Sequence, residues 1–206
     1  MNQRFIESIC FKSGNYQLLK YHQERINLTF LRFFPEHKPH HLHQVLPDLP
    51  MDGLYKVRVM YTGDSLDIEY AKYQKKQIKS VQLAEGLHID YGYKFEDRSA
   101  INALVKESEG DEIIIVKNDF ITDSSYANLV FWDGAKWWTP NTPLLKGVKR
   151  NYLLDKGIIR ETTIQIKDLK NFKKLCFINA MIDLDEISLP ITDRKPQPIA
   201  SKSTDS

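Results

Sequence analysis

The segment ITDSSYANLVFWDGAKWWTP, which spans residues 121–140, has the clearest local pattern in the chain. Phe120–Thr122 and Asn128–Trp132 are short runs rich in β-branched and aromatic side chains, a composition that favours strands. Asp133-Gly134 follows the second run and predicts a type I′ hairpin turn, which needs two positive φ angles. We expect the return strand over residues 136–139, ending before Pro140. The segment therefore predicts a β-rich second half of the chain.

Regular patterns continue on both sides of this hairpin. Before it, we expect a helix that includes Ser99–Lys106, a strand over Glu112–Lys117 and a turn at Asn118-Asp119. After it, the expected elements are a helix from Gly147 to Leu154 that ends near Gly157, a strand over residues 161–166, a helix N-cap at Asp168 and a core strand over residues 175–178.

The first half has the pattern of an antiparallel sheet with one covering helix. Residues 5–11 predict a strand, and residues 16–34 have apolar side chains at helical spacing before Pro35. Leu54–Tyr61 alternates cleanly, and further alternating segments follow at residues 67–73 and 77–83. With a junction near Gly86, we expect a small N-terminal α+β lobe over residues 1–86 and a second lobe over residues 87–189. Residues 190–206 are polar and predict a disordered tail.

Composition and charge argue against several classes of function. The 206 residues include 29 Lys and Arg against 27 Asp and Glu, so we expect neither nucleic acid nor a membrane as a partner. We also expect no signal peptide and no membrane-spanning segment. The two cysteines, Cys10 and Cys176, lie far apart, which predicts neither a disulfide framework nor a zinc site and favours the cytoplasm. The His-rich residues 37–43 lie among prolines without a cysteine or carboxylate partner, so we expect no metal there.

Lys94 stands out because of the ordered set of residues around it. The blocks are Ile6-Glu7-Ser8-Ile9 with Gly14, His22-Gln23-Glu24-Arg25, Tyr93-Lys94-Phe95, Ile121-Thr122-Asp123 with Asn128-Leu129-Val130-Phe131, Thr139-Pro140, Leu145-Lys146-Gly147-Val148-Lys149-Arg150 and Asn179-Ala180. Each block alone is weak, and each residue alone is most simply explained by a structural role. Separate structural roles, however, do not explain why all the blocks occur in this order.

This series resembles the class IV aminotransferase family, the pyridoxal phosphate (PLP) enzymes of fold type IV. The family includes D-amino acid and branched-chain aminotransferases and 4-amino-4-deoxychorismate lyase. The resemblance covers roughly residues 5–185 and implies an α+β fold, the D-amino acid aminotransferase-like PLP enzyme fold, with two α/β lobes and the cofactor between them. It also implies a homodimer that acts on a small molecule.

The resemblance assigns a role to each matched residue. Lys94 would form the Schiff base with PLP, which needs a lysine that loses its proton readily in a partly desolvated pocket. Asp123 would hold the proton on the pyridine nitrogen. Leu145 would pack against the ring. The remaining expected cofactor contacts, all near the phosphate, are Arg25, Gly147, Val148, Lys149, Asn179 and Ala180.

The sequence also departs from the family pattern. Asp123 stands where the family usually has Glu, Lys149 stands where a Thr is common, and Cys10 replaces a frequent Arg. We expect the strands that family members have before the Ile6-Glu7 block to be missing. In the family, those strands help to form the substrate side of the pocket and part of the dimer contact.

Two reactions fit the same core residues. A lyase would release pyruvate and form p-aminobenzoate from an aminodeoxychorismate-like substrate, whereas an aminotransferase would act on D- or branched-chain amino acids. Lys94 would move protons in both reactions. Because no arginine is securely placed to anchor an α-carboxylate, with Arg58 in an uncertain register, the sequence favours the lyase. A non-catalytic relative that keeps the fold is the alternative from another class.

Overall fold

The alternating segments of the first half form a four-stranded antiparallel sheet in the order β2-β1-β3-β4. The structure, a computed structural model, describes residues 3–50 and 52–191. The elements of this small lobe are β1 (Phe5–Lys12), β2 (Asn15–Tyr16), α1 (Leu19–Phe33), α2 (Leu42–Val45), β3 (Leu54–Tyr61) and β4 (Leu66–Lys72). The predicted sheet with one long helix is confirmed; the short helix α2 lies in the His-rich region, where no element was expected.

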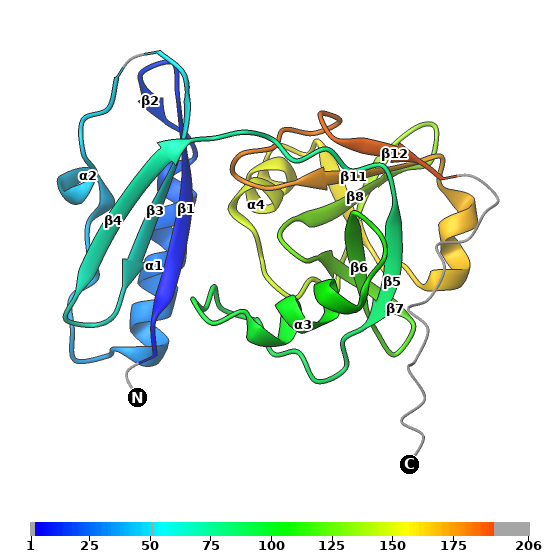
Figure 1. The fold of residues 1–206 in the computed structure, drawn as a ribbon, viewed down its shortest axis with the longest axis horizontal. Helices are drawn as coiled ribbons and strands as arrows, with labels where there is room; N and C mark the ends of the chain where they lie inside the picture. The colour runs from blue at the N-terminus through cyan, green and yellow to red at the C-terminus, as the bar shows by residue number, and fades with distance from the viewer. Residues whose placement is uncertain (1–2, 51, 192–206) are drawn as a thin grey trace.

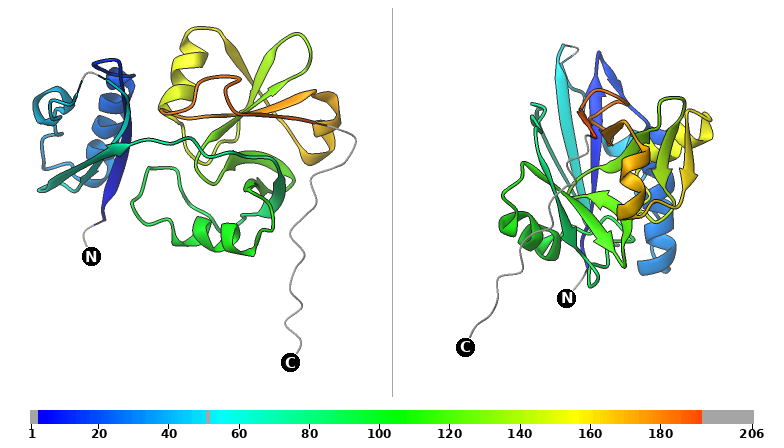
Figure 2. Two further views of the ribbon diagram at one scale, coloured as in Figure 1. Left: turned by 45° about the horizontal axis from the view of Figure 1, so that its top comes forward. Right: turned by 90° about the vertical axis from the view of Figure 1, so that its right-hand side faces the viewer.

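One face of this sheet is apolar because its strands alternate. Tyr55, Val57, Val59 and Tyr61 of β3 lie in the same buried cluster as Ile26 and Phe30 of α1. The other face, which includes Ser8 and Arg58, lines a cavity that the larger lobe shares. Figure 2 shows α1 packed against one face of this sheet, and the opposite face of β1 and β3 carries the residues that line the cavity.

The second lobe is built on a mixed sheet in the order β10-β9-β8-β7-β6-β5, with β11 pairing with both β8 and β12. Its elements are β5 (Val81–Glu85), α3 (Ser99–Glu107), β6 (Glu112–Lys117), β7 (Phe120–Ser124), β8 (Asn128–Trp132), β9 (Trp137–Pro140), α4 (Val148–Asp155), β10 (Ile159–Thr162), a 3₁₀ helix (Ile166–Asn171), β11 (Lys174–Ile178) and β12 (Ser188–Pro190). The two sheets lie side by side in Figure 1, each with its own buried apolar cluster. The predicted α+β fold class with two lobes is confirmed.

The structure corrects four details of the predicted elements. Residues 77–83 were expected to extend the first sheet, but β5 pairs in parallel with β6 of the larger sheet. The type I′ turn is at Asn118-Asp119, where both φ angles are positive, at 50° and 67°, whereas at Asp133-Gly134 only Gly134 has a positive φ. The strand expected over residues 161–166 ends at Thr162.

The fourth correction concerns Asp168. It was expected to be an N-cap, but it occupies the third position of the 3₁₀ helix, where its carboxylate accepts a hydrogen bond from the backbone N–H of Gln165 at 2.9 Å. The expected disordered tail lies almost wholly outside the described residues. The division into lobes at Gly86 stays a prediction.

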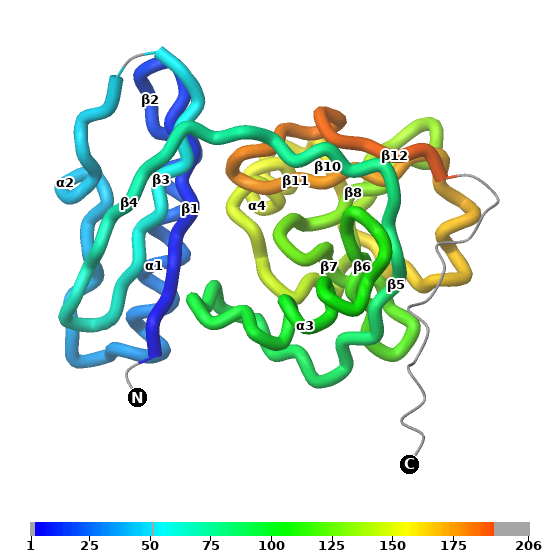
Figure 3. The backbone as a smooth tube through the Cα atoms, in the orientation of Figure 1, coloured from blue at the N-terminus to red at the C-terminus, as the bar shows by residue number. Residues whose placement is uncertain are grey.

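The chain passes between the lobes twice on its way to α3, as the tube in Figure 3 shows. It first runs from β4 to β5, and the segment before α3 then returns toward β1. No helix within the described ranges is long and apolar enough to cross a bilayer.

Candidate active site

A cavity of about 540 Å³ lies between the two lobes. The small lobe contributes residues of β1, α1 and β3, and the larger lobe contributes the segment around Lys94, the β7–β8 hairpin and the start of α4. Of the nine residues expected to form the site, all except Lys149 line this cavity: Arg25, Lys94, Asp123, Leu145, Gly147, Val148, Asn179 and Ala180.

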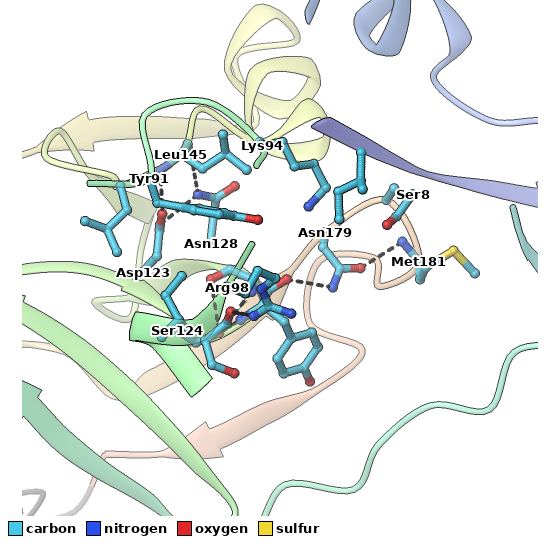
Figure 4. A pocket seen from close by; sticks show the side chains of 18 of the residues that line it. Ser8, Tyr91, Lys94, Arg98, Asp123, Ser124, Asn128, Leu145, Asn179 and Met181 are labelled. Carbon is cyan, nitrogen blue, oxygen red and sulfur yellow. Dashed lines mark hydrogen bonds between the residues drawn. The ribbon is translucent and has the colours of Figure 1, made fainter. Parts of the chain in front are cut away.

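Lys94 is held in place by backbone pairing with β1. The backbone N–H of Ile6 donates to the carbonyl of Lys94 at 2.9 Å, and the N–H of Glu96 donates to the carbonyl of Arg4 at 2.9 Å. This edge of β1 is open because β2 pairs only with Phe11 and Lys12. The backbone of Lys94 is therefore fixed, and its side chain enters the space that Asp123 and Asn179 also border (Figure 4).

The amine of Lys94 is easily deprotonated. Burial lowers its pKa most, and the positive charge of Arg25 lowers it further; together with Arg98 and Lys56 they outweigh Glu7 and bring the pKa of Lys94 to about 7. A neutral amine is the nucleophilic form of lysine. Near neutral pH this side chain is therefore ready to attack a carbonyl carbon.

Asp123 on β7 is a buried carboxylate with a fixed orientation. Its Oδ1 accepts a hydrogen bond from Asn128 Nδ2 at 2.7 Å, and its Oδ2 accepts one from the backbone N–H of Leu145 at 2.9 Å. Burial nevertheless raises the pKa of Asp123 to about 6. A cation beside it, such as a protonated ring nitrogen, would favour the ionised carboxylate.

Gly147, the N-cap of α4, packs against Asn128, which donates a hydrogen bond to this carboxylate. A Cβ at Gly147 would lie 2.0 Å from Asn128 Oδ1, so only glycine permits this approach. Asn128 Nδ2 also donates to the carbonyl of Leu145 at 2.8 Å, which fixes the loop before the helix. The first backbone N–H groups of α4 have no partner within the helix, and a negatively charged group would be stabilised there.

Arg25 is held by a buried carboxylate. Its Nε donates to Glu7 Oε1 at 2.8 Å, its Nη2 pairs with Glu7 Oε2, and His22 Nδ1 lies 2.5 Å from Glu7 Oε2. Burial opposes the charge on Glu7, but Arg25 and His22 outweigh it and lower the pKa of Glu7 to about 2. The guanidinium is therefore fixed at the edge of the cavity and remains a cation.

Lys149 is the expected residue that the cavity does not include. Its ammonium pairs with Asp183 and lies over the ring of Tyr152. Only its backbone N–H, in the first turn of α4, remains available for the expected contact. Asn179, by contrast, is fixed at the cavity wall by its bonds to the backbone of Tyr126 and Met181.

These residues fit PLP by their chemistry. An amine of lowered pKa and an oriented carboxylate match the aldehyde and the ring nitrogen of the cofactor. Arg25 and the N-terminus of α4 match a phosphate. Tyr126 also lines this cavity, and its buried hydroxyl has no hydrogen-bond partner among the described residues.

Comparison with known proteins shows to which family the chain belongs. The amino-transferase class IV family matches residues 97–188. A crystal structure from Haemophilus somnus, provisionally named a 4-amino-4-deoxychorismate lyase, is 31% identical with a TM-score of 0.84, covering 89% of this chain and 99% of that one. The chain belongs to the class IV aminotransferase family.

Two further similarities bear on the family. An uncharacterised protein of Haemophilus influenzae is 37% identical over 180 residues, 85% of this chain and 96% of its own length. A hypothetical aminotransferase of Mycobacterium tuberculosis in its PLP-bound form is 14% identical, with a TM-score of 0.72 over 97% of this chain and 84% of that one. At that identity the similarity shows a shared fold, and the bound PLP is a property of the Mycobacterium tuberculosis protein.

The sequence did not single out several residues that line the cavity of this class IV aminotransferase family member. They include Ser8, Lys56, Tyr91, Arg98 and Tyr126. Arg58 was noted, but its register was not predicted; the pairing of Ser8 with Arg58 now places it on the cavity face. Glu7 was quoted as part of a motif without a role, and its burial beside His22 and Arg25 supplies one. Asn128 was likewise quoted only as a motif residue.

Proposed function

We propose that the protein is a PLP-dependent enzyme in which Lys94 attaches the cofactor, and that it most resembles 4-amino-4-deoxychorismate lyase in its reaction. It would release pyruvate and form p-aminobenzoate. The observation that carries this proposal is that Lys94, with a pKa of about 7, and the oriented carboxylate of Asp123 border one cavity between two lobes.

The roles of the chain's residues follow from their environments. PLP, when bound, supplies an electron sink for bonds broken next to the substrate nitrogen. Asp123 would hold the proton on the ring nitrogen, and Leu145 would pack on the ring. Arg25 and the backbone N–H groups of Val148 and Lys149 would bind the phosphate, with Asn179 and Ala180 at its other edge.

Lys94 would also move protons. Its neutral amine would accept the proton from the substrate carbon next to the amino nitrogen. A pKa of about 7 suits this exchange, because the neutral and charged forms have similar populations near neutral pH. The same group can then return a proton to the product.

Two observations bear on the choice of reaction. The similarity to the Haemophilus somnus protein supports the lyase, and the cations Lys56, Arg58 and Arg98 at the cavity suit a substrate with two carboxylates. Arg58 could equally anchor the α-carboxylate of an amino acid. An aminotransferase acting on D- or branched-chain amino acids is therefore the second candidate.

Absorbance spectroscopy tests cofactor binding. Protein mixed with PLP and freed of excess cofactor should show a visible band that borohydride removes and that is missing from Lys94→Ala. Lys106→Ala, at an exposed position of α3, is the matched control and should keep the band. If the wild-type protein forms no such band, the proposal fails.

Product analysis tests the reaction. Incubation with aminodeoxychorismate should yield pyruvate and p-aminobenzoate in equal amounts. Amino transfer that depends on an added keto acid, without release of pyruvate, would contradict the lyase and support the aminotransferase. If the visible band persists and neither the lyase nor the aminotransferase reaction is detected, the result would instead support a non-catalytic relative. We also propose that the protein is a homodimer, as the family resemblance implies, and that it is cytoplasmic, as its two distant cysteines favour. Light scattering tests the first proposal and cell fractionation the second.

A further inference from the structure

Two cations of β3 lie on the cavity wall formed by the small lobe. Lys56 and Arg58 are two residues apart, so they share the strand face opposite to Val57 and Val59, which are buried against α1. Both side chains line the cavity between the lobes. Across the sheet, Arg58 is opposite Ser8, which also lines the cavity. None of these three residues has a role in the cofactor contacts proposed above.

The pairing of Arg58 is incomplete. Its Nη2 lies 3.4 Å from Glu96 Oε1, a long and single contact, while Glu96 Oε2 lies 3.5 Å from Arg4 Nε. Arg58 Nε is buried and has no hydrogen-bond partner among the described residues. A guanidinium offers several donors in one plane and binds a carboxylate best through two parallel hydrogen bonds. The contact with Glu96 therefore leaves other N–H donors of the Arg58 guanidinium available to a ligand.

Lys56 lies in an electropositive environment. Burial lowers its pKa most, and the charges of Arg58 and Arg98 lower it further. Since both named neighbours are cations, an anion placed among these three side chains would reduce their mutual repulsion. Arg98 is itself held at the cavity by its bond to the backbone carbonyl of Ser125.

Glu96 connects Arg58 to the segment that carries Lys94. It lies two residues after Lys94 in the segment that pairs with β1, so the side chain that contacts Arg58 belongs to the segment that carries the amine. An anionic group bound at Arg58 would therefore lie in the same cavity as Lys94.

We infer that Arg58, with Lys56 beside it, is the specificity-determining site for a carboxylate on the ring of the substrate and product. This inference rests on the proposed function, since it takes the cavity as the place where an amine-bearing ring reacts. The carboxylate would form two charge-assisted hydrogen bonds with Arg58 and replace its long contact with Glu96. Lys56 would add the second positive charge.

Calorimetric titration with a pair of matched probes tests the inference. 4-Aminobenzoate carries the carboxylate, and 4-aminobenzamide has the same shape without the charge. We expect the wild-type protein, mixed with PLP, to bind the benzoate more tightly. Arg58→Gln should weaken benzoate binding about tenfold or more and leave amide binding within a factor of about two. Lys56→Gln, at a more exposed position, should give a smaller loss of the same selectivity.

Arg160→Gln is the control, because Arg160 is exposed on β10 outside the cavity. Equal losses for benzoate and amide in both cavity variants, or no loss in either, would overturn the inference. The visible band of the same samples is recorded separately. If no band forms, the proposed function fails, but the difference between benzoate and amide still decides the role of Arg58. If the band forms and the difference is absent, only the role of Arg58 fails.

Discussion

At the scale of single residues, the environment of Lys94 combines two effects of the same sign. Burial disfavours the ammonium, and the fixed guanidinium of Arg25 repels it. Glu7 acts in the opposite direction, but its charge is largely taken up by the pair with Arg25 and the bond to His22. The positive charge of Arg25 therefore lowers the pKa of Lys94 even though Arg25 is paired with Glu7.

The first prediction concerns the reactivity of Lys94. Its labelling by acetic anhydride should rise with pH through a midpoint of about 7, because only the neutral amine reacts, rather than through the ordinary lysine value of 10.5. Peptide mapping by mass spectrometry measures it without any cofactor. Lys20, whose side chain is 79% exposed, serves as the reference for a solvated amine in the same sample. A Lys94 that labels in parallel with Lys20 at every pH would contradict the prediction.

The sequence identified Lys94 through the order of motifs, and its lowered pKa could not have been derived from that order. Burial and the nearby Arg25 depend on how two lobes approach each other, which local patterns do not encode. For the same reason, the partners of Arg58 could not be predicted, although its strand was predicted with the correct bounds. Lys149 shows the opposite case: its motif position is in α4, but its ammonium turns away to Asp183.

At the scale of secondary structure, local patterns predicted most elements and their bounds. Leu54–Tyr61, Glu112–Lys117 and Asn128–Trp132 are strands over the predicted residues because each has strong strand-forming side chains between clear breaks. The segment after β4 was assigned to the wrong sheet. Its alternation predicts a strand, but the choice of partner depends on contacts distant in sequence, here the parallel pairing of Val81–Glu85 with β6.

Gly147 gives the second prediction, which belongs to the junction of β8 and α4. Gly147→Ala should destabilise the protein by about 1–3 kcal/mol, because the added Cβ would displace Asn128 and leave its buried amide bonds to Asp123 and Leu145 unmade. Urea unfolding measures the loss. Gly92→Ala is the matched control, since a Cβ there would approach nothing closer than 3.9 Å. Equal destabilisation of the two variants would contradict the close approach at Gly147.

At the scale of the whole molecule, a buried charge network holds α1 to the sheet of the small lobe. Glu7 and His22 are both fully buried, and Arg25 is nearly so. Removing one partner of such a network leaves a buried charge without compensation, which typically costs about 3–5 kcal/mol. The stability of the small lobe should therefore depend on the ionisation of Glu7.

The third prediction is the pH dependence of unfolding. The pKa of Glu7 is lowered from 4.5 to about 2, because Arg25 and His22 outweigh the effect of burial. Its ionised form therefore contributes stability above pH 4.5, and this contribution is lost as the pH falls from 4.5 toward about 2. The lost contribution is on the order of 3 kcal/mol.

Urea unfolding of Glu7→Gln measures this effect. The variant should be less stable than the wild type at neutral pH, and its stability should fall less steeply over the acidic range. Glu69→Gln, exposed on β4, is the control and should follow the wild type. An acid profile that is the same for wild type and Glu7→Gln would show that the network does not govern acid stability.

The backbone pairing of the Lys94 segment with β1 has a mechanical consequence. Although residues 94–96 follow β5 in sequence, their hydrogen bonds join them to the sheet of the small lobe, whereas Asp123 belongs to the sheet of the larger lobe. Any hinge motion between the lobes would change the separation of the amine and the carboxylate. A molecule bonded to Lys94 at one end and held by Asp123 at the other would act as a strut across that hinge. Loading the cavity should then stiffen the whole protein as well as equip it for chemistry.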